Sequence, residues 1–146
     1  MKFFLASLCL ITVLSTGAQI REIPEVVKDA FAAQYPDADS VKFDDNLINV
    51  HVTFLNNGEH FYATYSNKGE WKQTEKGWEF DKLDSEVQEG FSKSKYANEW
   101  KVKETSIIYL PDGSERYRVK VAKSDVQKKY LFFDKTGRLI RDSLTI

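Results

Sequence analysis

Oxygen-bearing side chains gather around the first predicted strand, and these residue types suit a metal site. The group contains four carboxylates and one amide: Asp37, Asp39, Asp44, Asp45 and Asn46. Calcium binds oxygen ligands of this kind, and extracellular calcium sites can be weak. The spacing fits no calcium-loop pattern, so we expect a helix-to-strand loop and a solvated turn. Calcium binding by Asp37, Asp39, Asp44 and Asp45 stays as the alternative.

The two histidines, His51 and His60, could act in acid–base chemistry or bind a metal. They fall on one face of a predicted hairpin but at separate positions along it. No Ser-His-Asp or Glu-x-x-His arrangement surrounds them, and no glycine-rich phosphate loop occurs. The single cysteine, Cys9, lies in a segment that we expect to be removed. The sequence therefore predicts structural histidines, no catalytic residues and no cofactor.

The composition is that of a folded and nearly neutral protein. The chain has 146 residues, of which 42% are hydrophobic and 14% aromatic, enough for a packed core. Its 21 basic and 22 acidic residues give a formal net charge of -1. Such a charge supplies no basic field for nucleic acid or an anionic membrane. Nucleic acid is therefore not expected among the partners.

Residues 1–18 have the organisation of a secretory signal peptide. Lys2 supplies the positive charge, residues 3–14 are apolar, and residues 16–18 are small. The apolar run is shorter than the roughly 20 residues of a membrane span. We expect cleavage near Ala18, a periplasmic or secreted mature protein, and no membrane insertion after cleavage.

Two segments that start 60 residues apart carry apolar residues at helical spacing. In the first they are Ile23, Val27, Ala30 and Phe31, and in the second Leu83, Val87, Gly90 and Phe91. Pro24 suits the first turn of the first helix, and Asp84 with Ser85 offers N-cap chemistry to the second. We expect Phe31 and Phe91 to occupy equivalent core positions.

Alternating segments follow each predicted helix, as expected for strands. Residues 50–54 and 61–65 flank Asn57-Gly58, the strongest two-residue hairpin signal. Pairing Asn56 with Glu59 places six apolar or aromatic residues on one face: Val50, Val52, Phe54, Phe61, Ala63 and Tyr65. The second half repeats this plan over 107–110, 117–121, 130–133 and 139–140.

The sequence thus predicts an α+β fold of two tandem units, each with one helix packed on a roughly four-stranded antiparallel sheet. The units span 19–76 and 83–146, follow the signal peptide at 1–18, and are joined by a packed linker at 77–82. Together they are expected to form one domain. The second unit has about eight extra residues, which we place in a longer first hairpin around Pro111.

The predicted sheet face opposite the helices carries aromatic residues. Tyr62 lies there in the first hairpin, and Tyr130 and Phe132 alternate with core-facing residues in the second unit. Two interpretations stay open. The two sheets join or pack and these residues fill the seam, or an exposed face presents them to a protein partner. Trp71 and Trp100 are either core residues or part of that face.

The turn at Asp112 and Gly113 is the second candidate contact region. Pro111 stiffens the approach to it, and a stiff tip that loses little entropy on binding suits insertion into a cleft. An ordinary exposed turn is the alternative. Beside it, Arg116, Arg118 and Lys120 form a basic stripe at strand spacing. We expect three nearby acids to offset the stripe: Glu99, Glu104 and Asp125.

Several stretches carry a resemblance to a known family: residues 23–31 (IPEVVKDAF), 35–38, 65–71 (YSNKGEW) and 133–138 (FDKTGR), with Val87 and Phe91. They resemble the PepSY-like, beta-lactamase-inhibitor-protein-like periplasmic proteins common in Bacteroidetes. The resemblance covers nearly all of residues 20–146. It implies an exported, non-enzymatic binding or inhibitory module, and the PepSY domains of protease propeptides suggest restraint of a peptidase. The inhibitor proteins use their concave sheet and hairpin loops to fill an enzyme cleft.

We therefore expect a non-enzymatic protein-binding module that inhibits or regulates a periplasmic enzyme such as a peptidase. Its partner-binding candidates are Tyr62, Tyr130, Phe132, Asp112 and Gly113. The alternative is a small-ligand or calcium-responsive periplasmic sensor, which rests on the acidic group and on a groove expected between the sheets. A hydrolase is the least supported function because no nucleophile and base can be nominated.

Overall fold

The computed structural model describes residues 22–144, which form two α-helices, one short 3-10 helix and eight strands. The helices are α1 (Glu25–Gln34), η1 (Phe80–Lys82) and α2 (Ser85–Ser92). The strands are β1 (Asp39–Asp45), β2 (Asn49–Asn56), β3 (Glu59–Ser66), β4 (Trp71–Trp78), β5 (Lys101–Tyr109), β6 (Glu115–Ala122), β7 (Lys128–Asp134) and β8 (Leu139–Leu144). The predicted signal peptide at 1–18 lies outside the described residues. Within 22–144, no helix has the length and apolar character needed to cross a membrane.

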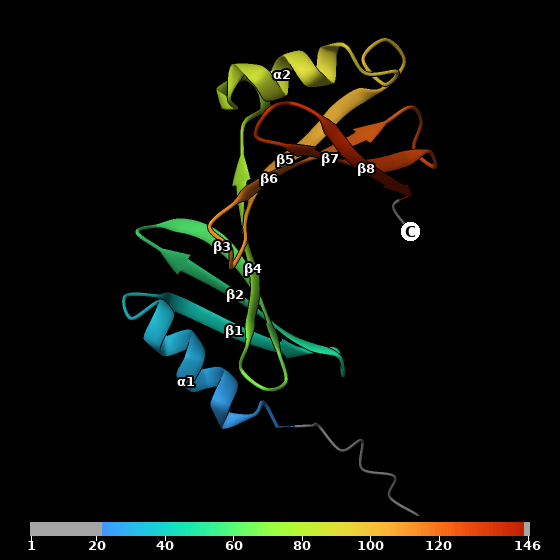
Figure 1. Cartoon of the computed structure of the whole chain (residues 1–146). Coiled ribbons are helices and arrows are strands. Elements are labelled where there is room, and N and C mark those ends of the chain that lie inside the picture. The colour runs from blue at the N-terminus through green and yellow to red at the C-terminus, as the bar shows by residue number, and fades with distance from the viewer. Residues whose placement is uncertain (1–21, 145–146) are drawn as a thin grey trace, which may run out of the picture.

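All eight strands form one antiparallel sheet in chain order (Figure 1). The expected α+β class is confirmed, but the strands form one eight-stranded sheet and not two four-stranded units, so the interpretation in which the two sheets join is the correct one. β4 pairs with β5 from Thr74 opposite Tyr109 to Trp78 opposite Thr105. In the first half alone β4 would be an edge strand, and in the second half alone β5 would be one. Each would present a row of unpaired N–H and C=O groups, which the pairing of β4 with β5 satisfies.

The segment expected as a linker at 77–82 contains two kinds of structure. Gly77 and Trp78 are the last residues of β4, opposite Ser106 and Thr105, and η1 follows at 80–82. Trp78 and Phe80 both pack against the second helix–sheet core, so this segment is ordered by packing. The unit boundaries at 76 and 83 stay a prediction.

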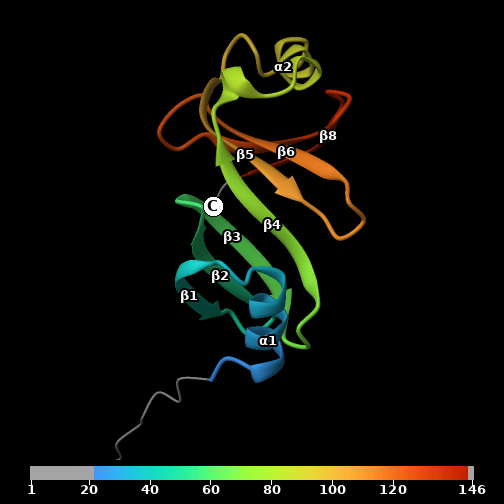
Figure 2. The same ribbon diagram turned by 90° about the vertical axis from the view of Figure 1, so that its left-hand side faces the viewer.

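Both helices cover the same face of the sheet. Val27 and Phe31 of α1 pack on a core from β2 and β3, and Val87 and Phe91 of α2 pack on a core from β6 and β7. The register connects these two cores on one face, through Ala63, Thr74 and Tyr109. Figure 2 shows the helices at the two ends of the sheet. The opposite face carries no helix of residues 22–144, and we call it the helix-free face.

The first hairpin has the predicted register. Asn56 pairs with Glu59, Phe54 with Phe61, and Val50 with Tyr65, which confirms the shared face. Asn57 and Gly58 both have positive φ angles, 52° and 78°, as a two-residue type I′ turn requires.

The extra residues of the second half are not confined to the hairpin around Pro111. Matching elements start 60 residues apart at α1 and α2, 62 at β1 and β5, 66 at β2 and β6, and 68 at β4 and β8. About half of the additional length therefore enters before β6, in β5 and its turn. The rest lies before β5 and after β6, which corrects the simpler placement.

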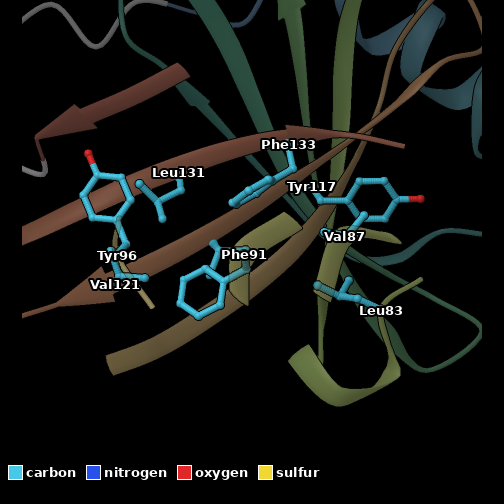
Figure 3. Close-up of a cluster of buried hydrophobic side chains, with 9 residues drawn as sticks. Leu83, Val87, Phe91, Tyr96, Tyr117, Val121, Leu131 and Phe133 are labelled. Carbon is cyan, nitrogen blue, oxygen red and sulfur yellow. The ribbon is translucent and has the colours of Figure 1, made fainter. Parts of the chain in front are cut away.

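Phe31 and Phe91 are buried, at 4% and 8% exposure, each beneath its own helix as predicted. Figure 3 shows the second of these cores, where Phe91 and Val87 of α2 meet Tyr117, Leu131 and Phe133 of the sheet. Asp84 is the N-cap residue of α2, but its carboxylate forms no hydrogen bond with a helix N–H. It accepts a hydrogen bond from the Tyr117 hydroxyl instead, at 3.0 Å.

Direct backbone contact fixes α2 on the turn between β7 and β8. A Cβ atom added to Gly137 would lie 1.9 Å from the Glu86 carbonyl oxygen, and one added to Gly90 would lie 1.9 Å from the Gly137 carbonyl oxygen. Real Cβ atoms do not approach that closely, so the helix reaches this depth only with glycine at both positions. A Cβ atom added to Gly69 of the first half would lie 2.8 Å from the Val26 carbonyl oxygen of α1, a less close approach.

Replacing Gly137 with alanine tests this contact. Gly137 and Gly113 both have a φ of 78°, but a Cβ at Gly113 would meet nothing within 4 Å. Gly113→Ala should therefore cost about 1–2 kcal/mol, the penalty of the left-handed conformation alone. Gly137→Ala adds the clash with α2 and should destabilise the protein by clearly more in urea denaturation. Equal losses in the two variants would contradict the close approach.

Buried tyrosines should make the protein unstable at alkaline pH. Burial, and then the hydrogen bond to Asp142, raises the pKa of Tyr96 to about 12, and burial also raises the pKa of Tyr65 and Tyr117. The unfolded chain releases these protons near pH 10, so their stabilisation is complete below pH 10 and is lost as pH rises towards 12. The urea midpoint should fall over this range, and less steeply in Tyr96→Phe. An identical slope in that variant would contradict the assignment.

Candidate partner-binding face

The helix-free face is the inner side of a bent sheet. In Figure 1, α1 and α2 lie at opposite extremes of the molecule with the strands between them. Because each helix covers the outer side of its half, the helix-free surfaces of the two halves incline towards each other. The register places Tyr62, Glu75, Arg118, Tyr130 and Phe132 on this side.

A row of interacting side chains crosses the centre of this face. Tyr62 on β3 lies opposite Glu75 on β4, and the Arg118 guanidinium on β6 donates to the Glu75 carboxylate across β5. The same guanidinium lies 4.7 Å from the ring centroid of Tyr130 on β7. The Glu75 and Arg118 side chains are only 11% and 27% exposed. The row therefore ties both halves of the sheet together on the side that no helix covers.

Small residues beneath Arg118 make this crossing possible. Arg118 is paired with Ser106 on β5, and Ser106 with Gly77 on β4. Adjacent strands lie about 4.8 Å apart, so the arginine must extend over β5 to reach Glu75. Ser106 is 4% exposed, and its Oγ has no hydrogen-bond partner among residues 22–144. A larger residue there would occupy the path of the arginine side chain.

Tyr62 is held in place by His51. The two rings stack with centroids 5.0 Å apart, and Tyr62 keeps 38% of its surface exposed. The Asn46 side-chain amide donates to Nε2 of His51 at 2.7 Å, so Nδ1 carries the proton and donates to Thr64 Oγ1 at 3.2 Å. Burial raises the pKa of the Tyr62 phenol, assisted by Asp44 and Glu75 and opposed by Arg118. His51 thus has the expected structural environment.

The basic stripe is only partly offset by the acids that we expected. Lys120 pairs with Glu104 at 2.6 Å, but Glu99 pairs with Lys123 outside the stripe, and Arg118 pairs with Glu75. At the far end of this face is a depression of about 420 Å3 whose lining is rich in lysine. Its charged lining residues are Lys101, Lys103, Glu104, Lys120, Lys123, Asp125 and Lys128.

A second and smaller depression of about 150 Å3 lies near Phe132. The Arg141 guanidinium lies 4.3 Å from the centroid of the Phe132 ring. The lining combines four apolar side chains with one glutamine and two arginines: Gln73, Ile108, Leu110, Arg116, Phe132, Ile140 and Arg141. Neither Arg116 nor Arg141 forms an ion pair with a carboxylate of the described chain.

Asp112 and Gly113 lie at the border of this face. The Asp112 carboxylate accepts from the backbone N–H and the hydroxyl of Ser114, at 2.9 and 2.6 Å, and these bonds hold its pKa below the usual range. The turn lies beside the turn between β7 and β8, and Leu110 at its base lines the smaller depression. The structure therefore places Tyr62, Tyr130 and Phe132 on one face and the turn at its edge.

Trp71 and Trp100 belong to the helix-covered side. Trp71 packs against the first core and donates its indole N–H to Thr74 Oγ1 at 2.9 Å. Trp100 packs against the second core and meets Tyr96 edge-on, with ring centroids 5.6 Å apart. Of the two alternatives for these tryptophans, the structure therefore supports the core position and not the helix-free face.

The acidic group near β1 builds a turn. The carboxylate of Asp45 accepts the Leu47 N–H at 2.8 Å, and the Asn46 side chain accepts the Asn49 N–H at 2.8 Å. Across residues 22–144, no three histidines, cysteines or acids come together as a metal site would require. The calcium alternative therefore has no geometric support in this part of the chain.

Two features were not predicted from the sequence patterns, one on the helix-free face and one at the turn between β1 and β2. The Arg118–Glu75 pair joins residues 43 positions apart, which pattern alone could not match. Leu47 and Ile48, at the turn between β1 and β2, are 72% and 77% exposed, and Asn67 donates to the Leu47 carbonyl at 2.8 Å. Two adjacent aliphatic residues inside an Asp- and Asn-rich turn were the available signal for the second feature.

One protein family matches this chain over most of its length. A family model described as "Putative beta-lactamase-inhibitor-like, PepSY-like" matches residues 16–66 and 48–141. The chain matches no curated protein.

Solved structures from Bacteroides share the fold. A DUF2874 family protein from Bacteroides ovatus is 25% identical, with a TM-score of 0.76 over 85% of this chain and 89% of its own. A BLIP-like protein from Bacteroides fragilis is 22% identical, with a TM-score of 0.74 over 87% and 89%. A Bacteroides eggerthii structure described among "putative periplasmic proteins" is 19% identical, with a TM-score of 0.75 over 85% and 90%.

The expected resemblance is confirmed by the family match across most of the sequence, and the solved structures agree on the fold. The chain therefore belongs to the PepSY-like family of beta-lactamase-inhibitor-like proteins.

Proposed function

We propose that this chain is an exported, non-enzymatic module that binds a protein partner through its helix-free face. The observation that carries the proposal is the row Tyr62, Glu75, Arg118 and Tyr130, which spans both halves of the sheet on its inner side. Tyrosine and arginine are enriched among the residues that dominate binding energy in protein interfaces. The BLIP-like fold supports protein binding in general.

The arrangement also suits a binding surface because it is preorganised. His51 holds the Tyr62 ring, and Glu75 holds the Arg118 guanidinium over the Tyr130 ring. Side chains that are already fixed lose less conformational entropy when a partner docks. Phe132 and the Asp112–Gly113 turn extend the proposed contact area along the second half.

We further propose that the partner is a periplasmic enzyme, such as a peptidase, whose activity this protein inhibits or regulates. A concave sheet bordered by hairpin turns can enclose a protruding part of an enzyme or fill the edge of its cleft. The periplasmic location is supported by a structural relative described as periplasmic and by the signal-like residues 1–18.

Quantitative capture from periplasmic extract tests the proposed face. The mature wild-type protein should retain a specific partner, and Tyr62→Ala and Tyr130→Ala should each weaken that interaction at least tenfold, as expected for interface residues of high energetic weight. Val26→Ala is the control, because Val26 is 49% exposed on α1 and lies on the opposite side of the sheet.

Purification of the captured protein then allows affinities to be measured directly. Loss of binding in Val26→Ala together with the tyrosine variants would indicate general unfolding and is checked by their melting temperatures. Unchanged affinity in both folded tyrosine variants would contradict the proposal.

The substitution Asp112→Asn tests the turn separately. Asparagine keeps a side-chain oxygen for the two Ser114 hydrogen bonds but removes the negative charge. If the carboxylate contacts the partner, affinity should fall by at least fivefold with no shift in melting temperature, since a lost charged hydrogen bond costs about 1.5–3 kcal/mol. Equal affinities would remove the Asp112 charge from the proposed site and leave the sheet face.

A further inference from the structure

We propose that the depression beside Phe132 binds a carboxylate attached to an apolar group, namely the C-terminal residue of a protein partner. This inference rests on the proposed protein-binding function and identifies one chemical group that the partner supplies. The depression lies on the helix-free face between β4, β5, β6, β7 and β8. It adjoins the central row of Tyr62, Glu75, Arg118 and Tyr130, because its lining residues Ile108 and Phe132 pair with Glu75 and Arg118.

Four of the lining residues of this depression are apolar, and Gln73 and the two arginines are polar. Ile108 is 4% exposed and closes the bottom, while Leu110, Phe132 and Ile140 form the sides. Ile140 keeps 45% of its surface exposed even though its neighbours define a concave site. A water molecule has a share of about 30 Å3 in the liquid. The 150 Å3 of the depression therefore equals the volume of about five water molecules, which is room for about one apolar side chain.

Arg116 and Arg141 line this depression, and neither forms an ion pair with a carboxylate of residues 22–144, although Arg116 adds to the Ser114 hydrogen bonds in lowering the pKa of Asp112. Arg116 lies on β6 opposite Asp134 on β7, and Arg141 lies on β8 opposite Phe132 on the other side of β7. The two positions are thus two strand spacings apart across β7 and two residues apart along it, so their Cα atoms lie about 12 Å apart, a distance that two long side chains can bridge to a shared ligand. Arg141 is already held against the Phe132 ring, 4.3 Å from its centroid.

The nearby acids are engaged by other groups: Glu75 pairs with Arg118, and Asp112 and Asp134 are held within their own turns. Asp112 Oδ1 accepts from the Ser114 N–H and hydroxyl, and Asp134 accepts from the Thr136 hydroxyl at 2.6 Å and from Arg138 Nε at 3.0 Å. No carboxylate of residues 22–144 comes within 4.0 Å of the charged nitrogens of Arg116 or Arg141. The two guanidinium groups are therefore available to a carboxylate from outside the chain.

Two arginines beside an apolar surface favour one class of anion, a carboxylate attached to an apolar group. Guanidinium groups bind carboxylate and phosphate alike, but besides the arginines only the Gln73 amide of this lining could donate to the further oxygens of a phosphate or sulfate. A chain-terminal apolar residue carries both required groups on one Cα atom, with its side chain for the floor and its carboxylate for the arginines. An internal glutamate would place its charge at the end of the inserted side chain, against Ile108. Charge complementarity and the size of the depression thus favour a C-terminal residue.

Methyl NMR titration of the full mature protein tests this site. The probe is the peptide Ac-Gly-Gly-Ser-Leu with a free C-terminal carboxylate, and the matched control is the same peptide with a C-terminal amide. The acid should shift the methyl signals of Ile108 and Ile140 in a saturable manner. The amide should bind at least tenfold more weakly, because it lacks the charge that both arginines recognise.

Charge-removing variants assign the effect to the two arginines. Arg116→Met and Arg141→Met keep an apolar stem and should each weaken binding of the acid at least fivefold. Lys68→Met removes one positive charge from an exposed turn of the first half and should leave the affinity within twofold. Melting temperatures of all three variants confirm that each remains folded.

Four outcomes would overturn the proposal. They are equal binding of acid and amide, unchanged affinity in both arginine variants, equal binding of an amide-capped peptide with an internal glutamate, and equal binding of free hexanoate. The last two would assign the site to an acidic side chain or a small organic acid. The peptide assay is independent of the capture assay, so its failure alongside a tyrosine-dependent partner would leave the protein-binding function intact.

Discussion

Backbone pairing between β4 and β5 is the interaction on which the rest of the structure depends. Five residue pairs join these strands, and they convert two helix-plus-strand halves into one eight-stranded sheet. With this register both helices lie on the same face of the sheet, and the helix-free face is continuous across the two halves. Without this pairing, Arg118 on β6 would not lie within reach of Glu75 on β4. The candidate binding face exists because the two halves share a sheet.

The halves are held together mainly by this pairing, because their apolar cores are separate. One buried cluster lies under α1 and the other under α2, and only Trp78, at the end of β4, packs against the cluster of the opposite half among the described residues. At the seam, the helix-covered side presents the polar Thr74, whose hydroxyl bonds to Tyr35 at 2.6 Å and accepts from Trp71. On the helix-free side, the seam is crossed by the Arg118–Glu75 pair. Polar contacts therefore reinforce the junction on both sides.

Local sequence signals were sufficient for the hairpins and helices but not for the junction. Asn57-Gly58 fixed the first register because few other residues tolerate both left-handed positions, and the helical spacing located Phe31 and Phe91. β4 ends in Glu75, Lys76, Gly77 and Trp78, which show no apolar alternation and so resemble a linker. Its pairing is decided by the open edge of β5, a non-local partner that local patterns do not reveal. The Arg118–Glu75 contact was unpredictable for the same reason.

Native-state hydrogen exchange across the junction tests this account most directly. If β4 and β5 are integral to one sheet, the hydrogen-bonded amides within residues 74–78 and 105–109 should exchange only through global unfolding. Their opening free energy should then equal that of the amides beneath α1 and α2 and the value from urea denaturation. A markedly lower opening free energy confined to these two segments would show two independent units. That result would contradict the single sheet and, with it, the continuous binding face.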